Sequence, residues 1–235
     1  MKINLCLLAR NEYACLVQLL PKIIELSQQL DLSIVAIDPN SSDGSRLLYL
    51  QNGVEVIEQK KSGRGAAMIQ AIEEFECDAI IFFSPDGNED VEDLPIMIEY
   101  LNQNYDLVIA SRMMKGAWNE EDHLYFKWRK WACQVFNWLA ILFFKPRQLK
   151  TVTDSINGYR AVRRLKIKEL KLTANDHTIE YQMTIRAMYN HMRIVEFATK
   201  EGERLAGESG VTSIPTGFRF IKRLFFEIKY HFINN

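Results

Sequence analysis

A carboxylate follows the most hydrophobic run of the sequence. Residues 80–83 (IIFF) lead directly into the segment 84–88 (SPDGN), which contains Asp86. If the run is a buried strand, it holds the Asp86 carboxylate on a rigid support at the edge of a sheet. Mg²⁺ and Mn²⁺ prefer oxygen ligands and usually share one or two carboxylates with substrate phosphates. Asp86 and the amide oxygen of Asn88 are therefore candidate metal ligands.

A second carboxylate opens a turn that is rich in Ser, Asp and Gly. Asp38 ends the apolar run 33–37 and precedes the segment 39–45 (PNSSDGS), which includes Ser41. Such a carboxylate can accept hydrogen bonds from a nucleobase or from ribose hydroxyls. The competing interpretation is ordinary turn and cap chemistry, for which Asp, Asn and Ser are preferred in any case.

A basic stretch with two glycines precedes a helical pattern at residues 60–65 (KKSGRG). Glycine lets the backbone approach a ligand closely, and the N-terminus of a helix favours anions. Lys61, Arg64 and Gly65 are therefore candidates for contact with a diphosphate. The phosphate-binding pattern G-x-x-x-x-G-K-[ST] is absent, and a solvated basic loop is the alternative interpretation.

The elements that must position these residues follow from hydrophobic periodicity. Short apolar runs alternate with segments in which apolar residues recur at helical spacing, as in 16–24 and 67–75. This alternation predicts a mostly parallel α/β sheet covered by helices, in which ligands bind beyond the carboxyl ends of the strands. Four polar loops, the first of them 9–12 (ARNE), should then share one edge. The expected strands are 3–8, 33–37, 54–57, 79–83 and 106–110.

Composition limits the classes of function. The 235 residues suit one domain, and a net charge of −1 gives no basic field for nucleic acid, so no nucleic-acid partner is expected. The four cysteines form no C-x-x-C pair, which favours reduced thiols in a cytoplasmic protein. The apolar start reads as a first strand and not as a signal peptide, because Arg10, Asn11 and Glu12 follow at once.

Six segments carry a resemblance to a known family. Residues 9–12 match a Y-N-E type segment, and 38–45 match a D-D-G-S-x-D-G-T turn. The other four segments are 61–67 (G-K-G-x-A), 84–88 (D-A-D-x-Q), 153–160 (D-x-x-x-G-[FY]-[KR]) and 204–209 (R-x-x-G-x-S). Their order over roughly residues 1–212 resembles family-two glycosyltransferases with the type A fold, and within them the dolichol/polyprenyl-phosphate sugar synthases.

The resemblance implies a single-domain nucleotide-diphospho-sugar transferase fold, with a central mostly parallel sheet flanked by helices. We expect a catalytic domain at 1–212, with a nucleotide-binding half at 1–115 and an acceptor half at 116–212, and an amphipathic C-terminal helix at 213–235. Inverting transfer from a nucleotide-diphosphate sugar, with Mg²⁺ or Mn²⁺ as cofactor, is implied. The implied donor-binding residues are Ala9, Arg10, Asn11, Glu12, Asp38, Ser41, Lys61, Gly65, Ser84, Pro85 and Asp86.

Two positions depart from the pattern of the synthases. Ser84 stands in place of the first Asp of the D-x-D motif, which predicts a lean metal site made by Asp86, Asn88 and the phosphates of the donor. Gly210 stands where the synthases usually have Lys, so a lipid phosphate is not expected to be clamped there in the same way. The loss of an Asp at position 84 also motivates an alternative, a non-catalytic nucleotide-sugar-binding protein.

The reaction that the resemblance implies needs cations beside the leaving diphosphate. The candidates are Lys61, Arg64, Arg160 and Arg204. A phosphate acceptor is already ionised and needs little help from a base. A hydroxyl acceptor, on a glycan or a soluble molecule, must lose its proton to a carboxylate, for which Asp154 is the first candidate and Glu180 the second.

Two aromatic segments bear on the acceptor. Residues 125–144 and 218–232 combine large apolar side chains with interleaved Lys and Arg. The apolar run of the first is too short and interrupted for a spanning helix. Basic amphipathic helices can lie in a membrane interface, while packing on the protein itself or a homodimer contact is the alternative. With the resemblance, we expect a membrane-associated acceptor, in particular a polyprenyl phosphate, and peripheral contact with the cytoplasmic membrane face.

Overall fold

The structure is a computed structural model that describes residues 1–144, 152–207 and 213–234. A seven-stranded sheet lies at the centre of this part of the chain, in the order β3-β2-β1-β4-β6-β5-β7. β6 is antiparallel to both of its neighbours and the other pairs are parallel, which confirms the predicted α/β sheet. The strands are β1 (Ile3–Leu8), β2 (Ser33–Asp38), β3 (Glu55–Glu58), β4 (Ala79–Phe83), β5 (Leu107–Ser111), β6 (Arg160–Arg163) and β7 (Ile194–Ala198).

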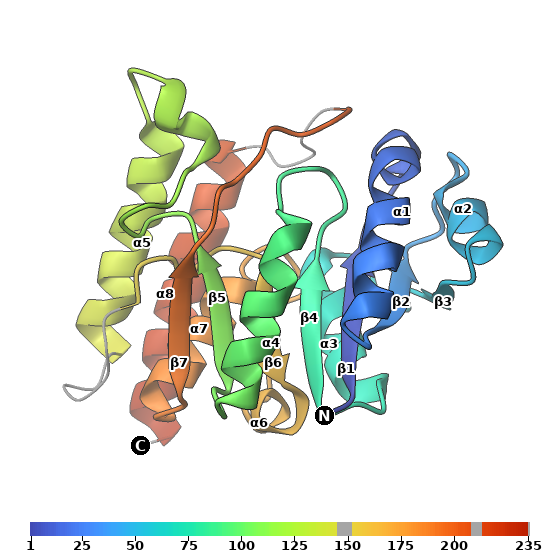
Figure 1. The fold of residues 1–235 in the computed structure, drawn as a ribbon. Coiled ribbons are helices and arrows are strands. Elements are labelled where there is room, and N and C mark those ends of the chain that lie inside the picture. Colours follow the sequence, from blue (N-terminus) through green and yellow to red (C-terminus); the bar gives the residue numbers. More distant parts are fainter. Residues whose placement is uncertain (145–151, 208–212, 235) are drawn as a thin grey trace.

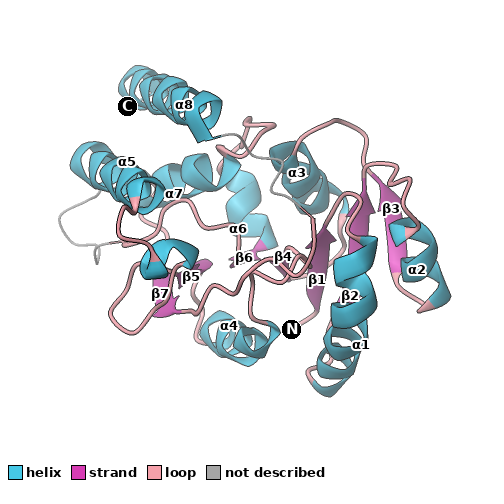
Figure 2. Ribbon diagram, turned by 90° about the horizontal axis from the view of Figure 1, so that it is seen from above, coloured by secondary structure: helices cyan, strands magenta, loops and turns pink. Residues whose placement is uncertain are grey.

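Helices cover both faces of the sheet (Figure 2). Successive side chains of a strand point to opposite faces, so Leu5 and Leu7 of β1 join the core under α1 and α4, while Cys6 and Leu8 join the core under α3 and α7. The helices are α1 (Tyr13–Gln29), α2 (Ser45–Gln51), α3 (Arg64–Glu74), α4 (Leu94–Asn102), α5 (Trp128–Phe144), α6 (Arg164–Glu169), α7 (Ile179–Tyr189) and α8 (Ser213–Asn234), with short 3₁₀ turns η1 (Val91–Asp93) and η2 (Glu120–His123).

Strands β6 and β7 were not among the predicted strands. β6 has the sequence RAVR, in which charge masks the apolar pattern. Its two arginines are accommodated because their guanidinium groups reach main-chain carbonyls: Arg160 donates to Asn157 O and Arg163 to Leu101 O. β3 and β5 each begin one residue later than predicted.

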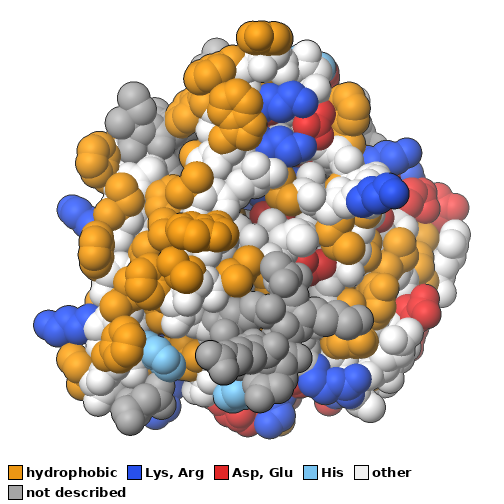
Figure 3. Space-filling view, turned by 90° about the vertical axis from the view of Figure 1, so that its left-hand side faces the viewer, with side chains coloured by type: hydrophobic (Ala, Val, Ile, Leu, Met, Phe, Trp, Pro, Cys, Tyr) orange, Lys and Arg blue, Asp and Glu red, His pale blue; other side chains and the backbone are white. Residues whose placement is uncertain are grey.

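The predicted amphipathic C-terminal helix is present as α8, and it packs along α5 and α7 (Figure 1). A fully buried ion pair fastens it, because Arg186 Nε lies 2.8 Å from Glu227 Oε2. The outer sides of α5 and α8 expose large apolar side chains, which crowd this side of the molecule (Figure 3); among them are Trp131, Trp138 and Phe225. Among the helices of the described residues, none combines the length and hydropathy that crossing a membrane requires.

Candidate active site

The loops after β1 and β2 are tied together at the carboxyl end of the sheet. The Asn11 N–H donates to Ser41 Oγ at 3.0 Å, and Asn11 Oδ1 accepts from the Ser42 N–H at 2.9 Å. The Glu12 N–H donates to Ser45 Oγ at 3.0 Å. Asn11 has a φ of 55°, a left-handed conformation that Asn adopts more readily than most residues. The two predicted loops therefore form one unit.

A cavity of about 840 Å³ opens beside this unit, and we call it the polar groove. Its volume lies in the range of sites for small molecules, roughly 300–1,000 Å³. Parts of all four predicted loops line it. Of the predicted donor-binding residues, those lining the groove are Ala9, Arg10, Asn11, Glu12, Ser84, Pro85 and Asp86.

Asp38 lies buried at the end of β2. Its Oδ2 accepts from the Ser41 N–H at 3.0 Å, with Arg46 Nη1 at 3.6 Å. Its Oδ1 is buried and has no hydrogen-bond partner within the described residues. A buried acceptor without a partner costs roughly 1–3 kcal/mol. Asp38 therefore combines the predicted turn chemistry with an unused acceptor, although it lies behind the groove lining and not in it.

The basic stretch 60–65 is arranged differently from the prediction. Lys61 is exposed and, like Gly65, does not line the groove. A Cβ on Gly65 would lie 2.2 Å from the main-chain oxygen of Ala174, and one on Gly63 2.1 Å from that of Asn175. The Ala66 N–H at the start of α3 donates to the same Asn175 oxygen at 3.1 Å. The glycines thus make room for the protein's own backbone, and Gly63 also lines the groove.

Arg64 is the cation of this stretch that reaches the site. Its Nε donates to Glu180 Oε1 at 2.6 Å and its Nη1 donates to Ser84 Oγ at 2.7 Å. A Cβ at position 158 would lie 2.2 Å from Arg64 Nη2, so Gly158 leaves the space that the guanidinium occupies. Burial lowers the pKa of Arg64, but Glu180 and Glu89 more than offset this and raise it above its usual value. Arg64 stays charged.

Asp86 and Arg204 form an ion pair in the lining of the groove. Asp86 Oδ2 lies 3.0 Å from Arg204 Nη1, and the same guanidinium bonds to Glu12. Main-chain bonds hold the two segments together, since the Leu205 N–H donates to Asp86 O at 2.9 Å and the Gly202 N–H to Asn88 O at 2.8 Å. The structure therefore places Asp86 and Arg204 next to each other in the polar groove. Glu208, Ser209 and Gly210, the remainder of that motif, lie outside the described residues.

Asp86 and Asn88 carry the oxygen atoms that a hard divalent cation would take here, and the cation would compete for Asp86 with Arg204 at Oδ2 and with the Asn88 N–H, which donates to Oδ1 at 3.2 Å. Asn88 Oδ1 is buried and has no hydrogen-bond partner within the described residues. Within those same residues, no group of three or more His, Cys, Asp and Glu side chains is arranged to hold a metal. Mg²⁺ and Mn²⁺ commonly take one or two carboxylates and complete their shell with substrate phosphates. Asp86 and Asn88 match such a lean site.

Glu89 is the carboxylate of this loop that the sequence interpretation missed. Its Oε2 accepts from the Ser84 N–H at 2.6 Å. Burial raises the pKa of Glu89 to about 8; the Arg64 guanidinium opposes this rise and the Asp86 carboxylate adds to it. Its acidic character and its place one residue after Asn88 were visible in the sequence, but the backward turn of the loop was not.

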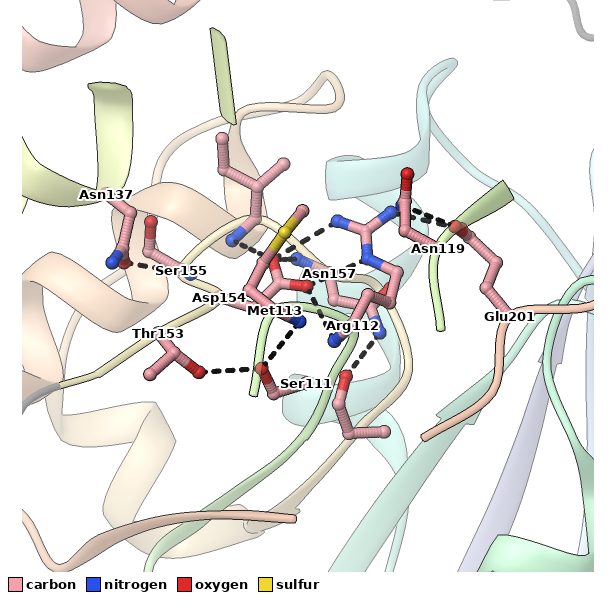
Figure 4. Close-up of polar contacts among 12 residues, drawn as sticks. Ser111, Arg112, Met113, Asn119, Asn137, Thr153, Asp154, Ser155, Asn157 and Glu201 are labelled. Carbon is pink, nitrogen blue, oxygen red and sulfur yellow. Dashed lines mark hydrogen bonds and ion pairs between the residues drawn. The ribbon is translucent and has the colours of Figure 1, made fainter. Parts of the chain in front are cut away.

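Asp154 forms a two-pronged ion pair with Arg112 (Figure 4). Arg112 Nε and Nη2 lie 2.8 and 3.1 Å from the two carboxylate oxygens, while Arg112 Nη1 lies 3.1 Å from Glu201 Oε1. Burial would raise the pKa of Asp154, but Arg112 and main-chain N–H groups hold it below its ordinary value. Both oxygens are thus engaged. Arg112 was missed, although it directly follows the carboxyl end of β5, as the other site residues follow their strands.

Arg160 does not reach the polar groove, contrary to the expectation that it stabilises a leaving group. It is fully buried, with 0% of its surface exposed. Its Nε donates to Asn157 O and its Nη1 to Glu180 O, at 2.8 and 3.0 Å. Burial lowers the pKa of Arg160 to about 10. Arg160 therefore braces the turn before β6 and the start of α7, which carries Glu180.

A second cavity, of about 300 Å³, lies next to the groove, and we call it the amphiphilic pocket. Its polar side includes Arg112, Arg129 and Glu201. Its apolar side comes from α5 and α8, through Trp128, Phe136 and Phe220. Both cavities share four lining residues: Arg64, Ser84, Asp86 and His177. The two cavities therefore meet at the predicted metal site.

Comparison with known proteins agrees with this geometry. The sequence matches the family model "Glycosyl transferase family 2" over residues 5–170. The chain therefore belongs to that family of glycosyltransferases, as its motifs predicted.

Two named proteins are similar to the chain in sequence. The chain is 25% identical over 235 residues to a dolichol-phosphate mannosyltransferase of Pyrococcus furiosus, across 98% of this chain and 64% of that protein. It is 27% identical over 157 residues to the glycosyltransferase AglJ of Haloferax volcanii, across 65% of this chain and 48% of that protein. The chain thus matches less than two thirds of the length of either relative.

Solved structures share the fold. A glucosyl-3-phosphoglycerate synthase of Mycobacterium tuberculosis, in complex with Mn²⁺, UDP and glucosyl-3-phosphoglycerate, superposes with a TM-score of 0.72. The match covers 97% of this chain and 79% of that one, at 18% sequence identity. The predicted type A glycosyltransferase fold is confirmed.

Proposed function

We propose that the protein transfers a sugar, with inversion, from a nucleotide-diphosphate sugar to a membrane-associated acceptor, a polyprenyl phosphate. The observation that carries this proposal is the meeting of the polar groove and the amphiphilic pocket at Arg64, Ser84, Asp86 and His177. A donor in the groove and an acceptor in the pocket would face each other there. Such an arrangement favours displacement in one step, from the side opposite the leaving group.

The donor half of the site is proposed to be residues 1–115. We propose that Asp38 serves the nucleoside from behind the groove lining, because its Oδ2 accepts from the Ser41 N–H, and that Asn11 and Ser41 hold the loop that would surround the nucleoside. The diphosphate would lie towards Arg64 and Arg204, which stand on either side of Asp86. Fixed cations aimed at a leaving group stabilise charge as it develops.

Asp86 and Asn88 would hold a divalent cation, Mg²⁺ or Mn²⁺. When bound, such an ion neutralises negative charge on the leaving diphosphate. The Mn²⁺ and UDP in the related synthase structure support this assignment. In the ligand-free protein, Arg204 supplies the positive charge beside Asp86.

Two features support a phosphate acceptor over a hydroxyl acceptor. First, the two predicted bases are already engaged: Asp154 is bound on both oxygens by Arg112, and Glu180 Oε1 accepts from Arg64. A phosphate needs no base, because it is ionised at neutral pH. Second, Arg129 at the half-exposed rim gives the pocket a cation that a phosphate could reach, and Arg112, held by Asp154 and Glu201, lines the same pocket. We propose that Asp154 orients Arg112 and does not accept a proton.

The apolar side of the amphiphilic pocket supports a lipid acceptor. Trp128 and Phe136 of α5 and Phe220 of α8 line it, and the same two helices expose further aromatic side chains outside the pocket. The mannosyltransferase named for dolichol phosphate is a relative along nearly the whole chain. We propose that residues 116–212 with α8 form the acceptor half and lie on the cytoplasmic face of a membrane.

A thermal-shift screen of sugar nucleotides tests the donor assignment. A ligand that binds the native state raises the unfolding temperature by mass action. We expect at least one UDP- or GDP-sugar to raise the unfolding temperature more with Mn²⁺ than with EDTA. If no sugar nucleotide gives a shift, the proposed donor site is wrong. Binding without turnover over lipid-phosphate, glycan and soluble acceptors would instead favour a binding protein.

A further inference from the structure

The loop that follows β4 has an unusual distribution of charge. Of the alternate positions 84, 86 and 88, position 86 alone has a carboxylate. The Ser84 hydroxyl is neutral and accepts from Arg64 Nη1 at 2.7 Å. Divalent cations bind more tightly as the number of charged ligands rises. A second acidic group near these positions would therefore matter for affinity.

Glu89 brings a carboxylate back to position 84. Its Oε2 accepts from the Ser84 N–H at 2.6 Å, although five residues separate the two in sequence. The loop between them reverses at Gly87, whose φ is 101°, in the left-handed region that favours glycine. Glu89 thereby lines the amphiphilic pocket beside Asp86 and Asn88.

The neighbouring acidic residues are engaged elsewhere. Asp90 Oδ1 accepts from the Glu92 N–H at 3.0 Å and caps η1. Glu92 pairs with Lys22 at 2.8 Å on the surface, with 59% of its side chain exposed. Asp93 Oδ2 accepts from Thr199 Oγ1 at 2.5 Å. Glu89 differs from them because it turns towards the end of β4.

We propose that Glu89 supplies the second acidic group that faces the divalent cation, in place of a carboxylate at position 84; this rests on the proposed function, because it takes Asp86 and Asn88 as the other ligands. The Ser84 N–H fixes Oε2, and the other carboxylate oxygen is directed at the cation or at one of its waters. The loop thus brings from position 89 an acidic group, which a bound cation would keep ionised, to the place where the sequence omits one at position 84.

A measurement of Mn²⁺ binding to the full chain tests this role. Electron paramagnetic resonance monitors the Mn²⁺, and UDP or GDP serves as the nucleotide probe. Glu89→Gln keeps an oxygen that can accept from the Ser84 N–H but removes the charge. We expect it to weaken Mn²⁺ binding about tenfold, with metal-free nucleotide binding unchanged. Glu92→Gln, in the adjoining 3₁₀ turn η1, should match the wild type. The double variant that combines Ser84→Asp with Glu89→Gln should regain most of the affinity for Mn²⁺.

The possible outcomes separate this inference from the proposed function. If Asp86→Asn abolishes Mn²⁺ binding while Glu89→Gln leaves it at the wild-type level, Glu89 only supports the loop and the inference is wrong. Normal Mn²⁺ binding with slow turnover in Glu89→Gln also overturns it, because Glu89 would then affect the reaction without contributing to metal binding. If the wild type itself binds nucleotide but no Mn²⁺, the proposed metal site and the role of Glu89 are both wrong.

Discussion

The polar groove and the amphiphilic pocket are built in different ways. The groove is lined mainly by loops that each follow a parallel strand, so its chemistry lies in short, contiguous segments. The pocket is assembled from distant segments, such as Arg112 with Asp154, 42 residues away, and with Glu201, 89 residues away. The difference teaches that the donor side of such a fold can be read from local motifs, whereas the acceptor side depends on ion pairs and helix packing that only the tertiary structure reveals.

The largest expected effect is at the junction of the two cavities. Asp86→Asn should lower sugar transfer about a thousandfold, because it removes the carboxylate that holds the cation at the leaving group. Donor consumption with Mn²⁺ measures this, and Glu92→Gln is the matched control. Near-normal turnover by Asp86→Asn would show that Asp86 is not part of a catalytic centre between the groove and the pocket.

The next effect concerns the ion pair that shapes the pocket. Asp154→Asn leaves the buried Arg112 without its main partner and should cost about 3–5 kcal/mol of unfolding free energy at pH 7. Because the pKa of Asp154 is lower in the folded state than in the unfolded chain, its contribution is complete above about pH 4 and is lost as the pH falls through the folded-state value. The difference from the wild type, measured by denaturant unfolding, should shrink on acidification; a difference independent of pH would contradict this.

A smaller effect should distinguish binding of the acceptor from binding of the donor. Arg129 lies at the rim of the pocket, with 48% of its side chain exposed, so its removal should leave the fold intact. Arg129→Gln should raise KM for a phosphate acceptor about tenfold and leave KM for the donor unchanged, because only the pocket loses a cation. Equal effects on both substrates would mean that the two cavities are not separate subsites.

The smallest effect is expected on the outer face of α5. Trp138 is 60% exposed, and in the proposed membrane contact it would enter the lipid surface. Trp138→Ser should reduce transfer to a polyprenyl phosphate in anionic vesicles about fivefold and leave transfer to a short-chain acceptor in solution unchanged. Leu47→Ser, on the equally exposed surface of α2, is the control. If Trp138→Ser slows transfer to both acceptors, or to neither, the outer face of α5 does not contact the membrane during transfer.

The sequence predicts the groove better than the pocket for physical reasons. Asp86 and the 9–12 loop line the groove, because a residue after a buried strand must emerge at the sheet edge, and their roles towards a donor stay predictions. Gly65 packs against backbone and does not line the groove, which the sequence could not show, since a glycine that accommodates a ligand and one that accommodates backbone look alike in sequence. Arg160 was misassigned because the charge of an arginine does not reveal that main-chain carbonyls will bury it. Arg112 and Glu89 were missed because their partners come from a long-range pair and from a reversed loop.

The most direct test of the central claim is the stereochemistry of one turnover. The full chain would be incubated with Mn²⁺, a sugar nucleotide selected by the thermal-shift screen and a short-chain polyprenyl phosphate, and the product would be examined by NMR. A donor in the polar groove and a phosphate in the amphiphilic pocket predict a sugar-phosphate product whose anomeric configuration is opposite to that of the donor. A product with retained configuration, or consumption of the donor with no sugar on the phosphate, would contradict the account.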